Sequence, residues 1–243
     1  MLVTGDREKL ECEILSIMEE RVEPMGSGLI SQLLQDRGFG VSEATVGRVL
    51  NEMDRKALTS KAGFKGRTIT DVGRTELEHF RNLERRLAYG NLFIETLKST
   101  KKEDLIDILV ARRAIERELA RLAALHATDS EILRMESVLI DQEQFSLQKQ
   151  MTAEQDVKFH KLVSESAKNK VLAAALDLIR HDGQLSPILE YIRTEVGGRL
   201  VVGHGKILSA IRDRDPDGAE QAMVDHIESL IEDVQKYWSL VER

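Results

Sequence analysis

The sequence contains few cysteine, proline and aromatic residues, and each shortage narrows the possible structures. The single cysteine, Cys12, excludes an internal disulfide and is typical of a reducing compartment. Three prolines and 4% aromatic residues favour helices throughout. No apolar run approaches the ~20 residues of a membrane span, and the N-terminus lacks the basic and then apolar layout of a signal peptide. We therefore expect a mainly α-helical, cytoplasmic protein that does not enter a membrane.

The charges of the chain are unevenly distributed. The net charge of −7 argues against nucleic-acid binding when it is averaged over all 243 residues. Residues 40–75, however, carry 7 Lys and Arg against 4 Asp and Glu. Contacts with phosphates depend on local charge, so this basic segment is the part of the chain that could bind DNA.

The first 75 residues have the pattern of a winged helix-turn-helix domain. Regularly spaced apolar residues predict helices over residues 7–22, 27–38 and 42–58. The segment LTSKAGFKGRTIT follows, with two β-prone runs around a basic turn. Three helices followed by a basic hairpin predict this domain, whose third helix would enter the major groove of DNA.

The candidate DNA contacts are polar side chains at the start of the third helix and on the hairpin. Side chains of these types meet base edges and phosphates in the major groove. The alternative is a small helical domain with an ordinary solvated face; the element order and the local charge favour DNA binding. The predicted contacts are Ser42, Thr45, Arg48, Lys61, Lys65 and Arg67.

The segment SEATVGRVLNEMDRKALTSKAGFKGRTITDVGR resembles the winged-helix domain of NrpR-type regulators. The resemblance covers about the first 75 residues. It departs from the usual GntR wing, because Lys65-Gly66-Arg67 does not reproduce the glycine-rich end of that wing.

A helical linker over residues 76–100 is predicted to join this domain to a helical bundle over residues 101–243. The linker helix is expected to begin near Asp71 and to end at Gly90, which places the domain boundary near residue 90. Helices are expected in the bundle over residues 102–125, 129–148, 153–167, 171–191, 199–212 and 215–238, with caps at Asp129 and Asp215. Gly183 and Pro187 mark a candidate break in the fourth of these helices.

Four residues of the predicted bundle form a candidate metal site. Asp156 and His160 lie one turn apart on one helix, while His204 and His226 lie on the apolar faces of two later helices. Burying these polar groups without partners would cost several kcal/mol, at about 1–3 kcal/mol each. A shared cation would remove that cost. Taken singly, each histidine is more simply a hydrogen-bonded core residue; the convergence of three helices favours metal.

The ligand set suits a divalent transition metal, namely Zn, Ni, Mn, Co or Fe. Four protein ligands complete a tetrahedral zinc site, whereas an octahedral ion keeps two positions for water or a chelating carboxylate. A metal-dependent enzyme acting on a small organic acid is an alternative. It is disfavoured because no readable motif places a buried Glu, Ser or Cys beside the ligands. A metal-free bundle that binds an organic effector directly is the other alternative.

The pattern from Asp156 and His160 through His204-Gly-Lys-Ile and Asp215-Pro216 to His226 is similar to the FCD domain, the ligand-binding domain of FadR-subfamily GntR regulators. The run Arg112-Arg113-Ala-Ile-Glu116 matches the first helix of that family. The resemblance covers about residues 100–238. It implies an antiparallel helical bundle that holds a metal through the four positions and binds a small carboxylic acid beside it.

The same resemblance implies that Arg112 pairs with the effector carboxylate. The alternative role for Arg112 is a surface ion pair with Glu116, one turn later. One departure from the family lies at Gly203, where an acidic residue is common.

Together these features predict a transcriptional regulator that is not an enzyme. An acid effector at the metal would modulate binding to operator DNA. A homodimer is expected, because two recognition helices must match two half-sites.

Overall fold

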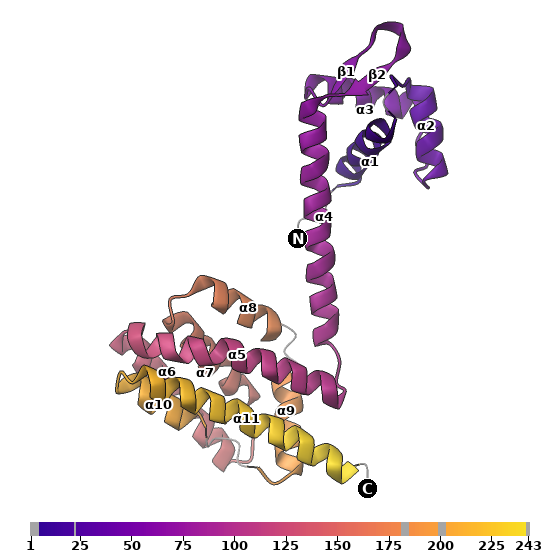
Figure 1. Cartoon of the computed structure of the whole chain (residues 1–243). Helices are drawn as coiled ribbons and strands as arrows, with labels where there is room; N and C mark the ends of the chain where they lie inside the picture. The colour runs from indigo at the N-terminus through magenta and orange to yellow at the C-terminus, as the bar shows by residue number, and fades with distance from the viewer. Residues whose placement is uncertain (1–4, 22, 181–184, 199–202, 242–243) are drawn as a thin grey trace. The chain divides into compact units, whose positions relative to one another are not determined.

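The computed structural model describes residues 5–21, 23–180, 185–198 and 203–241. The chain forms two compact units that divide between Asn91 and Leu92, and each unit is described here by itself. Helices make up most of both units (Figure 1), as the composition predicts. No helix in the described ranges combines the length and the apolar character that a membrane span requires.

The N-terminal unit is a winged helix-turn-helix, which confirms the predicted fold. The end of the first expected helix, at residue 22, lies outside the described residues. Ser42 caps the third helix, because its hydroxyl accepts a hydrogen bond from the Thr45 backbone N–H at 3.3 Å. The elements are α1 (Asp6–Glu20), α2 (Ser27–Asp36), α3 (Glu43–Arg55), β1 (Thr59–Lys61), the short 3-10 turn η1 (Gly63–Lys65) and β2 (Arg67–Ile69).

The wing is an antiparallel hairpin in which Thr59 pairs with Ile69 and Lys61 with Arg67. Arg67 also bridges to Met25, since each backbone N–H donates to the other residue's carbonyl oxygen at 2.9 Å. Gly66 makes this close approach possible. Its φ is +116°, and a Cβ there would lie 2.3 Å from the Met25 carbonyl carbon.

Helix α4 (Asp71–Leu97) is longer than expected. The sequence predicts an end at Gly90, but the helix continues through this residue for seven more. A glycine inside a helix costs only about 1 kcal/mol relative to alanine, so it does not by itself end one. Near its start, α4 packs on the N-terminal core through Gly73 and Leu77, both of which are buried.

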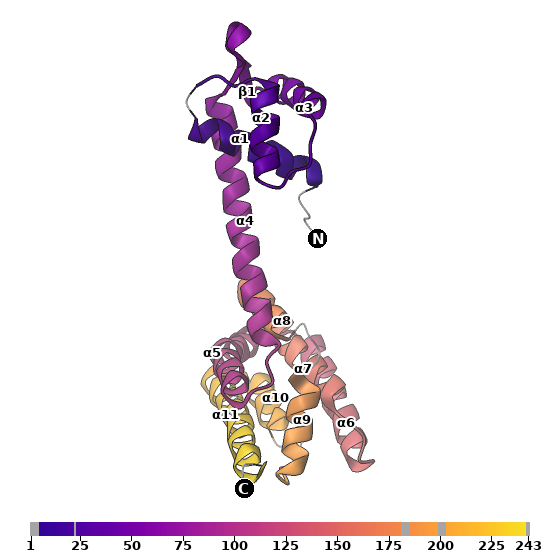
Figure 2. The same ribbon diagram turned by 90° about the vertical axis from the view of Figure 1, so that its right-hand side faces the viewer.

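The C-terminal unit is an antiparallel helical bundle, as predicted. Helices α5 and α11 run side by side in opposite directions (Figures 1 and 2). The expected helix over residues 171–191 is two helices, α8 (Lys170–Arg180) and α9 (Leu185–Glu195). Of the two candidate break positions, Gly183 lies outside the described residues and Pro187 lies inside α9. The expected helix from residue 199 is described from His204, since residues 199–202 are also outside. The helices are α5 (Lys102–His126), α6 (Asp129–Leu147), α7 (Ala153–Ser166), α8 (Lys170–Arg180), α9 (Leu185–Glu195), α10 (His204–Arg212) and α11 (Pro216–Val241).

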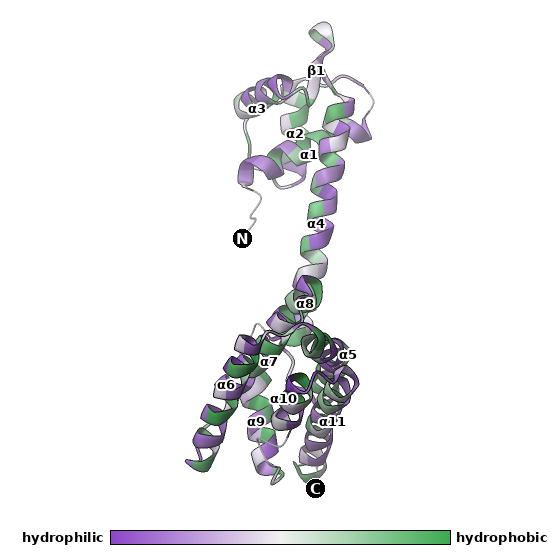
Figure 3. Ribbon diagram, turned by 90° about the vertical axis from the view of Figure 1, so that its left-hand side faces the viewer, coloured by the Kyte–Doolittle hydropathy of each residue, from purple (hydrophilic) through white to green (hydrophobic). Residues whose placement is uncertain are grey.

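Local sequence explains where these helices begin and which sides they bury. Thr128 caps α6 rather than Asp129, in a capping box with Glu131. Asp215 caps α11 as expected, accepting from the Gly218 N–H at 2.9 Å. Hydrophilic and hydrophobic residues alternate along helices such as α6 (Figure 3), as expected where one side faces a core. The core of the bundle includes Leu109, Ala120, Ala123, Met135, Phe159, Ile207, Ile211, Met223, Ile227 and Val234.

Candidate functional site

The bundle brings Asp156, His160, His204 and His226 together. Asp156 and His160 share a face of α7, His204 is the first residue of α10, and His226 lies midway along α11. One ligand-type atom from each of the four lies within 4.8 Å of those from the other three. The imidazoles are 1%, 1% and 5% exposed in that order, so the cluster is part of the core of the bundle.

Two of the imidazoles are oriented by partners on their outer nitrogens. His204 Nδ1 lies 2.8 Å from Gln142 Oε1, and His160 Nδ1 contacts the Glu116 carboxylate. Gln142 Oε1 and the Glu116 carboxylate are hydrogen-bond acceptors, so a proton on Nδ1 of each histidine would face them and leave the Nε2 lone pair turned to the cluster. The two Nε2 atoms face each other at 3.2 Å. Each also faces Asp156 Oδ1, at 3.3 Å from His204 and 3.5 Å from His160.

The Asp156 carboxylate has two differently used oxygens. Oδ1 faces the histidines, while Oδ2 accepts hydrogen bonds from Arg180 Nη2 at 2.6 Å and from Ser186 Oγ at 3.0 Å. Burial alone would raise the pKa of Asp156, but the Arg180 charge and His160 outweigh it and hold this pKa well below its ordinary range. The carboxylate is therefore ionised, with Oδ1 turned to the cluster.

His226 has no hydrogen-bond partner on either ring nitrogen among the described residues. Gly203 leaves the space that its ring occupies, since a Cβ on Gly203 would lie 2.4 Å from His226 Nδ1. Burial, together with the neighbouring His204 and His160, keeps the pKa of His226 well below its ordinary value. Burial likewise lowers the pKa of His204. These two imidazoles are thus neutral, which is the form that binds metals.

A divalent cation fits this donor set. Ligand-type atoms of Asp156, His160 and His204 lie 3.2–3.5 Å from one another. In a metal site with metal–ligand distances of about 2.1 Å, neighbouring ligand atoms lie roughly 3 Å apart. The separations in this cluster are close to that value. His226 adds a buried nitrogen that no other described residue hydrogen-bonds. Gln142 and Glu116 are the outer partners that histidine ligands of metals usually have.

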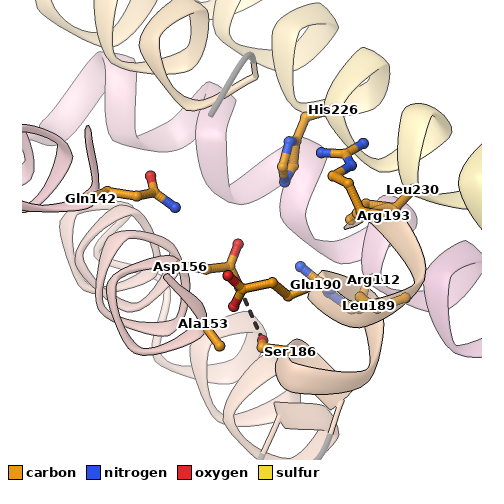
Figure 4. A pocket seen from close by; sticks show the side chains of 10 residues that line it. All are labelled: Arg112, Gln142, Ala153, Asp156, Ser186, Leu189, Glu190, Arg193, His226 and Leu230. Carbon is orange, nitrogen blue, oxygen red and sulfur yellow. Dashed lines mark hydrogen bonds between the residues drawn. The ribbon is translucent and has the colours of Figure 1, made fainter. Parts of the chain in front are cut away.

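A small cavity adjoins the cluster. Its volume is about 40 Å³, enough for one or two water molecules and too small for an organic acid without enlargement. Figure 4 shows the side chains of Asp156, Glu190 and Arg112 directed toward the same space. The lining residues are Arg112, Gln142, Ala153, Asp156, Ser186, Leu189, Glu190, Arg193, His226 and Leu230.

Arg112 does pair with Glu116, but the pair is buried rather than on the surface. Arg112 Nε donates to Glu116 Oε1 at 2.6 Å, and both side chains are 1% exposed. Burial would raise the pKa of Glu116, yet Arg112 and His160 lower it well below its ordinary value. Arg112 Nη2 has no hydrogen-bond partner in the described part of the chain. The pairing with Glu116 thus leaves this atom available to a ligand in the cavity.

The predicted DNA contacts lie on α3 and the wing. Arg48, Lys61 and Lys65 are exposed, and Arg48 Nη2 donates to Thr45 Oγ1 at 3.3 Å. Arg67 has a different environment. Its Nε donates to Asp54 Oδ2 at 2.9 Å and its Nη2 to Asn51 Oδ1 at 2.7 Å, so it fastens the wing to α3, and a phosphate contact by Arg67 remains only a prediction.

The FCD domain family model matches residues 107–229, half of the chain. The chain belongs to the FCD domain family. This confirms the resemblance of the C-terminal half to GntR-type regulators. The four clustered residues and Arg112 all lie inside the matched range of the FCD domain.

Other comparisons extend over the N-terminal unit and most of the chain. The Ribonuclease R winged-helix domain family matches residues 12–77. The global nitrogen regulator NrpR of Methanococcus maripaludis is 36% identical over 95 residues, which are 39% of this chain and 17% of NrpR. This bears out the predicted NrpR resemblance. The chain thus spans less than a fifth of that relative.

Two further comparisons cover most of this chain and most of the other protein. The Uxu operon regulator of Haemophilus influenzae is 27% identical over 187 residues, covering 72% of this chain and 70% of that protein. A solved structure described as Streptococcus agalactiae GntR matches with a TM-score of 0.48 and 19% identity. It covers 93% of this chain and 99% of the other.

The sequence analysis did not predict the polar residues that surround the cluster of Asp156 and the three histidines. Gln142, Arg180 and Ser186 come from α6, α8 and α9, and Glu190 follows one turn after Ser186. None belongs to a motif. Gln142 is 1% exposed although its neighbours in the sequence are polar, and only the packing of α6 against α10 shows what it contacts.

Proposed function

We propose that this FCD-family chain is a homodimeric transcriptional regulator whose C-terminal unit binds a divalent metal and a small carboxylic acid. The observation that carries the proposal is the convergence of ligand-type atoms from Asp156, His160 and His204 beside His226, whose ring nitrogens have no hydrogen-bond partner among the described residues. In this proposal the four residues hold the ion, and the ion supplies a Lewis-acidic centre for a carboxylate. The identity among Zn, Ni, Mn, Co and Fe is left to metal analysis.

The surroundings of the cluster support an acid as the effector. Arg112 Nη2 is a buried cationic donor at the edge of the cavity, suited to pairing with a carboxylate oxygen. Because the cavity has room for only one or two water molecules, binding an organic acid requires side chains around it to move. A ligand that binds one arrangement of the bundle better than another shifts the balance between them, and coupling of about 1–3 kcal/mol suffices.

DNA binding is assigned in this proposal to α3 and the wing. The start of α3 exposes Ser42 and Arg48, and the wing exposes Lys61 and Lys65. These are the positions from which a winged helix contacts the major groove and the phosphates. Two relatives are a global nitrogen regulator and a regulator of the Uxu operon, which supports operator DNA as the partner.

The test begins with metal analysis of full-length protein purified without a histidine tag. We expect close to one transition-metal ion per chain, and a loss of most of it in His204→Ala. His126→Ala is the matched control, since His126 is an exposed histidine at the end of α5, and it should retain the ion. Equal metal content in wild type and His204→Ala would refute the site.

The second part of the test concerns the effector and DNA. Thermal-shift screening with small carboxylic acids, with and without chelator, should give stabilisation that disappears with the metal. DNA sequences selected from a random pool by the metal-loaded protein should then change affinity when the same acid is added. Turnover of the acid by the purified protein would instead favour the enzyme alternative.

A further inference from the structure

The cavity beside the cluster of Asp156 and the three histidines is lined by an acidic side chain, Glu190. Only one of its two carboxylate oxygens is hydrogen-bonded within the described part of the chain. Glu190 Oε1 accepts hydrogen bonds from the Thr152 backbone N–H at 2.7 Å and from Thr152 Oγ1 at 3.3 Å. Its other oxygen, Oε2, is buried and has no hydrogen-bond partner among the described residues. A buried acceptor left in this state costs about 1–3 kcal/mol unless a ligand or water satisfies it.

The same cavity is also lined by a buried cationic side chain with a hydrogen-bond donor that no described residue uses. Arg112 is 1% exposed, and its Nη2 has no partner in the described ranges. Arg193 also lines the cavity, but its guanidinium is occupied by α11. Its Nε donates to Asp233 Oδ2 at 2.5 Å and its Nη2 to Ser229 Oγ at 2.6 Å. Figure 4 shows the Arg193 guanidinium turned toward His226, away from the Glu190 carboxylate.

A ligand that completes this cavity must therefore carry two different groups. One is an anionic oxygen for Arg112 and the metal, and the other is a hydrogen-bond donor for Glu190 Oε2. An unsubstituted acid would place CH groups against a buried carboxylate and leave it unpaired. A dicarboxylic acid would place a second negative charge there, which is worse because like charges repel in a site of low dielectric.

Glu190 also borders a second hollow. Besides the cavity, it lines a cleft on the surface together with Gln150, Met151, Tyr191 and Thr194. Glu190 therefore belongs to the lining of the cleft as well as to the lining of the cavity.

We propose that Glu190 selects, among small carboxylic acids, those with a hydroxyl or protonated amino group remote from the carboxylate. This inference rests on the proposed function, because it takes an acid effector at the metal as its starting point. Glu190 acts as a specificity-determining residue that accepts a hydrogen bond from that remote group.

The test compares acids that differ only at the far end of the chain. Calorimetry on metal-loaded, full-length wild type would use butyrate, 4-hydroxybutyrate, 4-aminobutyrate and succinate, followed by the three-carbon set of propionate, 3-hydroxypropionate, 3-aminopropionate and malonate. Within at least one set, the hydroxy or amino acid should bind about 10-fold or more tightly than the unsubstituted acid and the diacid, as expected for one satisfied buried acceptor. This series needs no variant.

Glu190→Gln then assigns the selectivity to this residue. Glutamine keeps an oxygen for the Thr152 N–H, so the local fold should persist, while its amide N–H can donate to a second carboxylate. We expect the preference for the hydroxy or amino acid over the diacid to fall to about 3-fold or less. Glu195→Gln on the same helix, at an exposed position, is the control and should retain the wild-type preference.

Three outcomes would overturn the inference, and they are distinguishable. If wild type binds the unsubstituted acids or the diacids as tightly as the substituted ones, Glu190 does not select donors, although an acid effector stands. If the preference exists but is unchanged in Glu190→Gln, another residue produces it. If metal-loaded wild type binds none of the acids, the proposed acid effector fails and this inference fails with it.

Discussion

Replacing Gln142 by leucine should weaken metal binding at the proposed site without altering any of its four candidate ligands. Gln142 is 1% exposed, and its Oε1 is the acceptor for His204 Nδ1 at 2.8 Å. Leucine has a similar length and fills the space, but it cannot accept that hydrogen bond. The His204 N–H would then be buried without a partner, at a cost of about 1–3 kcal/mol.

The same substitution frees the His204 ring to turn and to change its tautomer. Loss of an outer partner of this kind typically costs 10- to 100-fold in metal affinity, which corresponds to about 1.4–2.7 kcal/mol. Competition between the protein and a coloured zinc chelator measures the Zn²⁺ Kd, and denaturant unfolding of the metal-free protein measures stability. The Zn²⁺ Kd should be higher, and the stability of the metal-free protein lower, in Gln142→Leu than in wild type.

Two further variants make this prediction refutable. Gln144→Leu lies two residues away on the exposed side of α6, and it should leave the Zn²⁺ Kd unchanged. Gln142→Glu restores an acceptor and adds a charge that favours the metal-bound form, so its affinity should equal or exceed that of wild type. If Gln142→Leu is destabilised but binds Zn²⁺ with wild-type affinity, Gln142 only packs, and the orientation argument is wrong.

Three other predictions concern stability and reactivity. Gly66→Ala should destabilise the N-terminal unit by about 2 kcal/mol or more, because the new Cβ would overlap the Met25 backbone. Denaturant unfolding followed by circular dichroism measures this loss, and a loss below about 0.5 kcal/mol would contradict the prediction. Burial, assisted by nearby carboxylates, raises the pKa of the Cys12 thiol from 9.0 to about 11, so at pH 8 its reaction with a disulfide reagent should be roughly 100-fold slower than in unfolded chain; reaction at the unfolded rate would show an exposed thiolate. The Lys168 ammonium, with the Thr128 backbone N–H, lowers the pKa of Glu131 from 4.5 to about 2, so its carboxylate stabilises the fold above about pH 4.5 and loses this effect as the pH falls toward 2. The loss of Tm in Glu131→Gln relative to wild type should therefore shrink over that interval, and a constant difference would contradict this.

The fold could be read from the sequence because helical periodicity is a local property. Asp156 and His160 are four residues apart, so their shared face follows from helix geometry alone. His204 and His226 lie on rows of apolar residues that had to face the core, so their burial was predictable as well. Convergence of the three helices followed from the same reasoning, because each helix has only one apolar side.

Long-range polar contacts could not be read in this way. Gln142 and Glu190 have no periodic signal, and their partners are 62 and 38 residues away in the chain. Some local features were readable but were misjudged. Thr128 and Glu131 have the spacing of a capping box, yet the cap was expected at Asp129. The sequence also predicts that α4 ends at Gly90. A single glycine costs a helix only about 1 kcal/mol, which is too little to end it.

The burial of the three imidazoles has a consequence for time as well as for affinity. His160 and His204 are 1% exposed, and the cavity beside them is about 40 Å³, so we expect a chelator to reach an ion bound here mainly after side chains or helices around it move. The rate of metal loss should then be limited by this local opening and should level off as the chelator concentration rises. Removing the metal for the effector screen would therefore require a long chelator treatment.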